Sequence, residues 1–390
     1  MSSPDVIVVG GGIMGCTVAW RLARAGLSVC VLERSVPGAE ASTAAAGILG
    51  PMMEAEEVGP ALRLGLRSAE LYTQLAAELR AEHALEIGHR VTGLLRVALE
   101  SEAGGETELE AHAARLRGSG LAATRDVALL SGEEARRREP SLAPEVCMAL
   151  ELPGEGQVDP RLLLPALSMA GERDGVRFVT DSVVREVLVR AGRAQGVRLD
   201  AGPLHAAHVV VAAGSWTSVV PGVPLAAATI APVKGQVMRT HARPRLLERV
   251  VFGAGGYLVP RAAGDVLVGA TTEHVGFARG VTLAGLAELI TIATRVAPRL
   301  QSCPVLDHWA GFRPGTPDGL PLVGPTPVEH LWLASGHYRN GILLAPVTAE
   351  ILVAQLLGQP LGVREDDASA LDPRRFAATT ETPQTPESAP

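Results

Sequence analysis

Residues 10–15 form a glycine-rich loop, GGGIMG, between a short β-branched run (residues 5–9, DVIVV) and an apolar segment with helical spacing (residues 16–25). A buried strand that passes through a tight turn into a helix is the first half of a βαβ unit. The loop fits the pattern G-x-G-x-x-G, whose small residues allow the turn, the approach of backbone to a pyrophosphate, and the packing of the helix on the strand. The matching residues are Gly10, Gly12 and Gly15.

A second strand, predicted over residues 28–32, ends at Glu33. This carboxylate lies 21 positions after Gly12, close to the spacing of about 20 residues at which an acidic side chain hydrogen-bonds the ribose of a bound dinucleotide. The helix N-terminus after the loop would offer free N–H groups to the phosphates. The alternative interpretation is a glycine-rich turn with a structural role alone.

The rest of the chain alternates helical and strand-like patterns. Helical periodicity predicts helices over residues 60–86, 161–171, 282–296 and 341–357, and β-branched runs predict strands over residues 176–180, 209–213 and 331–335. A hairpin is expected from residues 183–189 and 194–199, and successive strands from residues 230–240, 249–260 and 265–271.

This order of elements predicts an α/β fold, with a Rossmann-like dinucleotide-binding domain built on a parallel sheet and an inserted α+β substrate domain built on an antiparallel sheet. The nucleotide domain is expected from residues 1–85, 156–220 and 308–360, and the substrate domain from residues 86–155 and 221–307. Residues 361–390 end in a Pro-, Thr- and Glu-rich tail and are predicted to be disordered.

Composition argues against several classes of protein. The formal net charge is −7 and no basic stripe is visible, so we expect no nucleic-acid partner. No basic residue precedes the N-terminal apolar run, and Pro346 and Glu350 interrupt the most apolar stretch, so neither a signal peptide nor a membrane span is expected. The four cysteines form no CxxC pair and the ten histidines no HxxxH or HExxH spacing. We therefore expect no metal site and a reducing, cytoplasmic location.

A run of small residues, STAAAGI (residues 42–48), follows the second strand. Small side chains let the backbone lie against a flat, bulky group. A solvent-facing, Ala-rich loop or helix start fits the run equally well.

Several longer motifs resemble the FAD-dependent D-amino-acid-oxidase superfamily, and within it the glycine oxidases of thiamine biosynthesis. The match runs over most of residues 5–358, and its last two motifs are long and specific. Besides the N-terminal loop and Glu33, the motifs are STAAAGIL, PVKGQV (residues 232–237), YLVPR (257–261), LVGATTE (267–273), WAGFRPGTPDGLPLVG (309–324) and GHYRNGILLAP (336–346).

The resemblance implies FAD bound without a covalent link. The expected cofactor contacts are Gly10, Gly12, Ile13, Met14 and Gly15 at the pyrophosphate, Glu33 and Arg34 at the ribose, Val184 at the adenine, Ala41, Ser42, Ala46, Gly47 and Ile48 on the flavin side, and His337, Tyr338, Arg339, Asn340, Gly341, Ile342 and Leu343 around the isoalloxazine. Residues 266–268 contain no lysine and Cys303 precedes the flavin-contacting motif, which disfavours covalent flavin and sarcosine-type chemistry. Lys234 is expected to face solvent.

The resemblance also implies that Arg313, Arg339 and Tyr257 hold a substrate carboxylate. A guanidinium binds a carboxylate through two parallel hydrogen bonds and stays charged when buried, and a phenol hydroxyl can donate one more. From the residues alone, a surface ion pair of Arg313 with Asp318 and an ordinary strand position for Tyr257 are alternatives. We predict no catalytic base, because in flavin chemistry the protein supplies position and charge.

We therefore predict an FAD-dependent oxidase that converts glycine or another small amino acid or amine to the imine, which hydrolyses to the 2-oxo acid and ammonia, while O2 is reduced to H2O2. The imine would supply the thiazole of thiamine. The alternatives are a D-amino-acid dehydrogenase that passes electrons to a quinone or other carrier, a non-catalytic flavin-binding scaffold, and a nicotinamide enzyme. The expected partners are the small substrate and O2, with neither nucleic acid nor membrane, and the resemblance implies a homotetramer.

Overall fold

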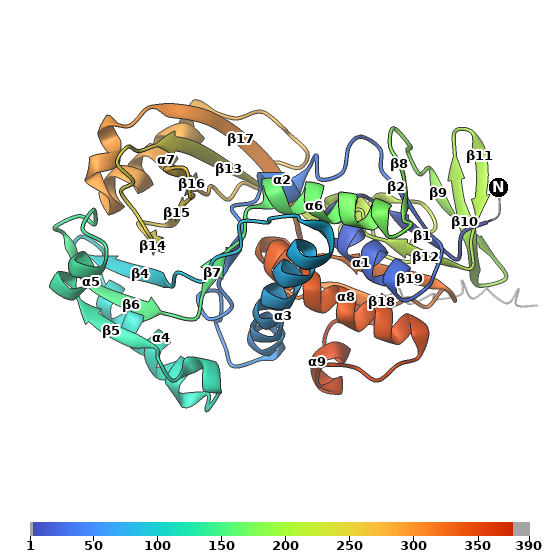
Figure 1. Ribbon diagram of the computed structural model, residues 1–390, viewed down its shortest axis with the longest axis horizontal. Coiled ribbons are helices and arrows are strands. Elements are labelled where there is room, and N and C mark those ends of the chain that lie inside the picture. Colours follow the sequence, from blue (N-terminus) through green and yellow to red (C-terminus); the bar gives the residue numbers. More distant parts are fainter. Residues whose placement is uncertain (1–2, 377–390) are drawn as a thin grey trace, which may run out of the picture.

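The computed structural model describes residues 3–376 and contains two large sheets toward opposite ends of the molecule (Figure 1). The first sheet has six strands, parallel except for the edge strand that pairs antiparallel at one side. Its central strand is buried along its whole length, as expected for a parallel sheet covered on both faces. In spatial order the strands are β18 (Leu322–Pro325), β19 (Leu331–Ser335), β12 (His208–Val211), β1 (Val6–Val9), β2 (Val29–Leu32) and β8 (Arg177–Val179).

The second sheet has eight strands, all paired antiparallel except for one parallel pair, β14 with β4. In spatial order they are β17 (Val305–Gly315), β13 (Ala231–His241), β16 (Asp265–Gly269), β15 (Gly256–Pro260), β14 (Val250–Gly253), β4 (Leu94–Leu99), β6 (Val146–Leu152) and β5 (Ala128–Ser131). Together the two sheets confirm the predicted fold class.

Two details of this sheet differ from the prediction. Residues 308–315, expected in the nucleotide domain, continue β17 and pair with β13 along its length. Residues 249–260, expected as one strand, form the hairpin β14–β15, because Ala254 (φ 53°) and Gly255 (φ 80°) adopt left-handed backbone conformations and turn the chain.

Two smaller sheets complete the strands. One is the predicted hairpin extended by a third strand, and the other joins the end of the small-residue run to residues 156–157, just before the helix that begins at Pro160. Their strands are β9 (Glu186–Arg190), β10 (Arg193–Leu199) and β11 (Gly202–His205), and β3 (Ile48–Leu49) with β7 (Gly156–Gln157).

The helices cover the sheets. The largest core cluster joins α1, α3, α6 and α8 to one face of the parallel sheet, whereas α7 packs on the antiparallel sheet. The α-helices are α1 (Ile13–Arg24), α2 (Ala41–Ala44), α3 (Pro60–His83), α4 (Gly105–Gly118), α5 (Gly132–Arg138), α6 (Pro160–Arg173), α7 (Leu283–Val296), α8 (Gly341–Leu357) and α9 (Glu365–Ser369). The 3-10 turns are η1 (Ala122–Thr124), η2 (Gly214–Val219), η3 (Pro298–Ser302), η4 (Tyr338–Asn340) and η5 (Pro373–Phe376).

The prediction of disorder from residue 361 onward is wrong for residues 361–376, which contain α9 and η5. Side-chain contacts anchor this segment. Asp367 in α9 accepts hydrogen bonds from Arg63 in α3, and Arg375 donates to Asp318 and to the backbone carbonyl of Leu320. The remainder of the predicted tail, residues 377–390, lies outside the described residues.

Helix α8 contains Pro346, which has no N–H to donate to the carbonyl of Ile342 four residues earlier. The hydroxyl of Tyr72 in α3 donates to that carbonyl instead (2.6 Å). The hydroxyl of Ser68, also in α3, donates to the carbonyl of Leu343 (2.6 Å) and accepts from the N–H of Val347 (3.3 Å). Thus α3 completes the hydrogen bonding of the first turns of α8.

The helical span Tyr338–Leu357 is long and apolar enough to cross a membrane, with a mean hydropathy of 1.6, but 61% of its most apolar 18-residue stretch is buried inside the protein. Its packing against α1 and α3 identifies it as a core helix.

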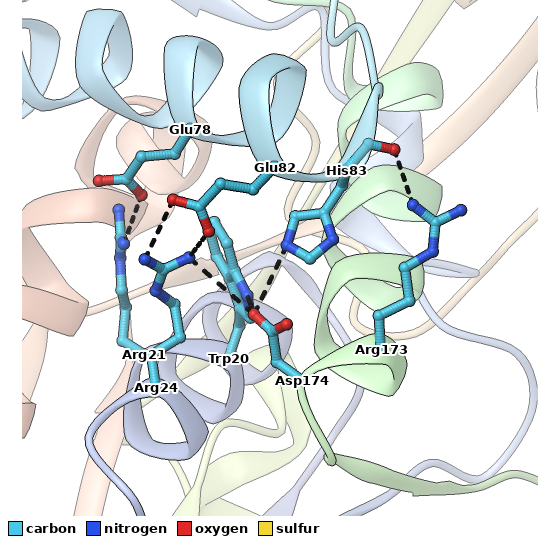
Figure 2. Close-up of polar contacts among 8 residues, drawn as sticks. All are labelled: Trp20, Arg21, Arg24, Glu78, Glu82, His83, Arg173 and Asp174. Atoms are coloured by element: carbon cyan, nitrogen blue, oxygen red, sulfur yellow. Dashed lines mark hydrogen bonds and ion pairs between the residues drawn. The ribbon is translucent and has the colours of Figure 1, made fainter.

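A cluster of polar side chains joins α1, α3 and α6 (Figure 2). The indole N–H of Trp20, a fully buried residue, donates to the Asp174 carboxylate (2.7 Å), which also lies 3.5 Å from Nε2 of His83. At the more exposed edge of the cluster, Arg24 pairs with Glu82. The buried part of the cluster therefore links the three helices through one carboxylate.

We expect the Trp20→Phe variant to lower the free energy of unfolding by about 1–3 kcal/mol, because it removes the indole donor of a buried hydrogen bond and leaves a void. The Arg24→Gln variant, which removes the exposed ion pair with Glu82 and the longer contact with Asp174 (4.0 Å), should cost less than about 1 kcal/mol. Urea unfolding followed by circular dichroism measures both. A larger loss for Arg24→Gln than for Trp20→Phe would contradict this account.

Candidate active site

One cavity lies where the carboxyl ends of β12 and β19 meet the small-residue segment 41–48 and strands β13, β15 and β17. Crevices at this edge of a parallel sheet are where ligands bind in open α/β folds. The cavity brings together fifteen of the predicted site residues: Ile13, Met14, Ala41, Ser42, Ala46, Gly47, Ile48, Tyr257, Arg313, His337, Tyr338, Arg339, Asn340, Gly341 and Ile342.

The glycine loop places the N-terminus of α1 at this cavity. Gly10 has φ +105°, and a Cβ at Gly15 would overlap the carbonyl oxygen of Gly10, so the loop tolerates no side chain at either position. The first turn of α1 contains no acidic residue, and the N–H of Ile13 donates to the Ser42 hydroxyl (2.9 Å). The positive end of the helix dipole is therefore available to an anion, and Ser42 is fixed beside it.

Glu33 lies at the carboxyl end of β2, outside the cavity lining. Its carboxylate accepts hydrogen bonds from the backbone N–H groups of Gly11 (2.7 Å) and Ser35 (2.9 Å), which fix its orientation and leave further acceptor positions free. Val184 follows shortly after Ser182, whose N–H donates to the carbonyl of Glu33 (2.9 Å). The residues predicted for the ribose and adenine thus lie near one another.

Two predicted cofactor residues make other contacts. The Arg34 guanidinium lies over the ring of Trp216 (3.9 Å to the ring centroid) and pairs with Glu40, outside the cavity lining. The Leu343 side chain is buried in the core, close to Gly65 of α3, because it points to the face of α8 that packs on that helix.

The small-residue segment lies along the cavity instead of facing solvent. The indole N–H of Trp309 in β17 donates to the carbonyl of Ala44 (3.0 Å), and Arg261, which follows β15, donates to the carbonyl of Ala46 (2.6 Å). Gly47 has φ +71°, and its carbonyl accepts from the N–H of Val158 (2.8 Å). Of the two interpretations of this run, the structure supports the backbone wall.

The beginning of α8 and the residues just before it form another wall of the cavity. His337 is buried, and its Nε2 lies 2.9 Å from the hydroxyl of Thr348. Burial lowers the pKa of His337 to about 3, so its ring is neutral at physiological pH. Gly341 and Ile342 begin the helix at the cavity, where no side chain of α8 caps its N-terminus.

Arg313 and Tyr257 lie in the cavity because the facing strands carry glycines. Arg313 on β17 pairs with Val233 on β13, and a Cβ at Gly235 would overlap the guanidinium of Arg313. Likewise Tyr257 on β15 pairs with Gly269 on β16, where a Cβ would overlap the phenol ring. The alternative pairing of Arg313 with Asp318 is wrong, since Asp318 binds Arg375.

The ionisable side chains in the cavity influence one another's pKa values. Burial raises the pKa of Tyr257, and the nearby guanidinium groups of Arg313 and Arg339 offset part of this rise, so the hydroxyl keeps its proton as a donor. Nε of Arg339 lies 3.3 Å from the Glu54 carboxylate, which raises the pKa of Arg339. Sequence reasoning missed Glu54, whose only signal is a carboxylate just after a long run of small and apolar residues.

The buried carboxylate of Glu155 orders the loop that carries Glu54. Oε1 of Glu155 accepts hydrogen bonds from the backbone N–H groups of Met52 (2.5 Å) and Met53 (3.0 Å), and Glu155 is 1% exposed. Burial raises the pKa of Glu155 to about 8, although the two amide hydrogen bonds oppose this rise.

The chain matches a family model described as "FAD dependent oxidoreductase" (DAO) over residues 5–355. It is 36% identical over 98% of its length to the bifunctional protein ThiO/ThiG of Synechocystis, of which it covers 55%, so the chain spans about half the length of that relative. It is 35% identical to the glycine oxidase of Geobacillus kaustophilus, covering 90% of this chain and 92% of that protein. The crystal structure of a glycine oxidase from Geobacillus kaustophilus superposes with a TM-score of 0.88 at 31% identity, covering 95% of this chain and 98% of that chain.

We expect the Glu155→Gln variant to be more stable relative to wild type at about pH 8.5 than at about pH 5. An unfolded glutamate loses its proton near its ordinary pKa of 4.5, whereas folded Glu155 keeps its proton up to about 8, so wild-type stability falls as pH rises through this window. The difference should grow by more than about 1 kcal/mol in urea unfolding at the two pH values. The matched control is Glu145→Gln at an exposed position, and an identical pH dependence of wild type and Glu155→Gln would exclude this ionisation behaviour.

We expect the Gly235→Ala variant to weaken binding of acetate by about tenfold or more, because the new methyl group displaces the Arg313 guanidinium, whose hydrogen bonds to a carboxylate are charge-assisted. Acetate binding is measured from the change in the visible absorption of the flavin-loaded protein. The control is Gly280→Ala, since a Cβ at Gly280 meets no atom within 4 Å. Equal acetate affinity in Gly235→Ala and wild type would place the carboxylate elsewhere.

Proposed function

Because the chain belongs to the FAD dependent oxidoreductase (DAO) family, we propose that it catalyses oxidative deamination of glycine or another small amino acid. The observation that carries this proposal is the position of Arg313 and Tyr257 in the same cavity as the N-termini of α1 and α8. A carboxylate-binding pair next to a dinucleotide-binding loop is what an amino-acid oxidase needs. The similarity to glycine oxidases supports the choice of a small substrate.

The residues present fit FAD. The N-terminus of α1 fits the pyrophosphate, Glu33 fits the ribose, and the backbone of residues 41–48 with the start of α8 fits a flat ring system. When bound, FAD supplies the acceptor for the two electrons and the hydrogen of the substrate Cα–H bond.

The side chains of this chain bind and orient the substrate. We propose that Arg313 and Tyr257 bind the carboxylate, the guanidinium by two parallel hydrogen bonds and the phenol as a further donor. Arg339 contributes less free positive charge, since it already pairs with Glu54. The N-terminus of α8 presents its positive dipole end to the cavity, which favours the build-up of negative charge there.

The proposed overall reaction is glycine, O2 and water to glyoxylate, ammonia and H2O2. The imine formed first would feed thiazole synthesis for thiamine, which the similarity to the ThiO/ThiG protein supports. A cytoplasmic location fits four cysteines that are all free thiols, and we propose a homotetramer, as the family resemblance implies.

The test is to purify the protein with its cofactor and to measure H2O2 with glycine, sarcosine and D-alanine. We expect a yellow protein with absorption near about 450 nm, non-covalent FAD released on denaturation, and peroxide formation with glycine in air. The size of the side chain that the cavity accepts follows from comparing glycine with D-alanine.

Reoxidation of the reduced flavin in air separates the oxidase from a D-amino-acid dehydrogenase, in which O2 reacts slowly and an added quinone reacts fast. Absence of flavin, or no reduction of the flavin by any of the three amines, would refute the proposal.

A further inference from the structure

An ion pair between a buried lysine and a partly exposed glutamate lies on the side of β13 that faces away from the cavity. Lys234 is 2% exposed, and its Nζ lies 3.0 Å from Oε2 of Glu273. The expectation that Lys234 faces solvent is therefore wrong. Side chains alternate along a strand, so Lys234 and Gln236 point away from the face on which Gly235 contacts Arg313.

The Glu273 carboxylate accepts hydrogen bonds from two further side chains. Nε2 of Gln236 donates to it at 2.7 Å and the hydroxyl of Thr271 at 2.6 Å. Burial alone would raise the pKa of Glu273, but the hydrogen bonds from Thr271, Gln236 and Lys234 lower it below its ordinary value. The group is thus a charged carboxylate with three side-chain partners rather than a proton donor.

This network fixes the backbone of residues 271–273 against β13. The backbones of Lys234 and Glu273 exchange two hydrogen bonds, at 3.0 and 2.9 Å. The N–H of Gln236 donates to the Thr271 hydroxyl (2.9 Å), and the side-chain amide oxygen of Gln236 accepts from the N–H of Thr282 (2.9 Å). The segment cannot shift without breaking bonds to the ion pair.

Arg313 depends on the same segment. Its Nη1 donates to the backbone carbonyl of Thr271 (3.1 Å). That hydrogen bond, a hydrogen bond with the Tyr257 side chain and the close approach to the backbone of Gly235 hold the guanidinium in the cavity.

We propose that Lys234 and Glu273 form a positioning pair, which holds the Thr271 carbonyl in place and thereby aims the Arg313 guanidinium at the substrate carboxylate. Neither residue contacts the substrate, because neither lines the cavity. The inference rests on the proposed function only in assigning a carboxylate to Arg313. It predicts that loss of the pair weakens carboxylate binding and leaves the FAD site intact.

The experiment uses the flavin-loaded double variant Lys234→Met/Glu273→Gln, because removing one partner alone would leave an unpaired buried charge. We expect the acetate dissociation constant to rise about tenfold, with unchanged FAD content and visible spectrum. The KM for glycine should rise by a similar factor, while kcat at saturating glycine changes by less than about threefold. Lys234→Arg, which keeps the charge, should stay within about threefold of wild type for acetate.

The matched control is Arg239→Met/Asp265→Asn, which removes an ion pair (3.0 Å) that joins β13 to β16 five residues further along the strand. This variant should bind acetate like the wild type. If the Lys234→Met/Glu273→Gln protein does not fold, Thr271→Val provides a second route, because it removes the hydroxyl that ties residue 271 to Glu273 and should weaken acetate binding several-fold.

Acetate affinity within about twofold of wild type in a folded Lys234→Met/Glu273→Gln or Thr271→Val protein would overturn the inference. So would a wild-type protein that binds no acetate, since Arg313 would then bind no carboxylate. Acetate binding that responds as expected, in a protein that does not oxidise glycine, would uphold the positioning pair and refute the proposed function.

Discussion

The site depends on glycines at positions where another group of the protein packs directly against the backbone. The Arg313 guanidinium occupies the space that a Cβ at Gly235 would need, and the Tyr257 ring does the same at Gly269. At the nucleotide end, helix α1 can approach the loop only because Gly15 has no Cβ against the carbonyl of Gly10. Both halves of the cavity therefore rely on the same property, close approach to bare backbone, and a single added methyl group is enough to disturb either half.

The cavity region also contains charged side chains, and each of them has a bonding partner. Arg339 pairs with Glu54, Arg313 donates to the Thr271 carbonyl, and behind β13 Lys234 pairs with Glu273. Since a buried unpaired charge is costly, the counter-charges allow several cations near one small ligand site. Among these cations, Arg313 has no carboxylate partner within residues 3–376, since it bonds the Thr271 carbonyl and the Tyr257 side chain, and so its charge is available for a substrate carboxylate.

Local patterns were sufficient to predict the first βαβ unit, because the glycine loop, the strand before it and Glu33 lie within about thirty residues and each has a direct physical meaning. Arg313 and Tyr257 could be predicted only through longer family motifs, since their strands meet by pairings that no local pattern encodes. Glu54 and the pair of Lys234 with Glu273 were missed for the same reason. Composition also misled at residues 361–376, where anchoring by Arg63 and Arg375 outweighs a tail-like sequence.

Helix α3 shows that the cavity also depends on residues that do not line it. No residue of α3 lines the cavity, yet Tyr72 and Ser68 satisfy the carbonyls that Pro346 and the following turn leave without helical partners. Without these hydroxyls the first turn of α8 would contain a buried, unpaired carbonyl at Ile342, which costs about 1–3 kcal/mol and favours fraying. The start of α8 is the part of that helix at the cavity, so its order is needed for the helix dipole to act there. Helix α3 is thus a structural requirement of the ligand site, and not only a cover for the parallel sheet.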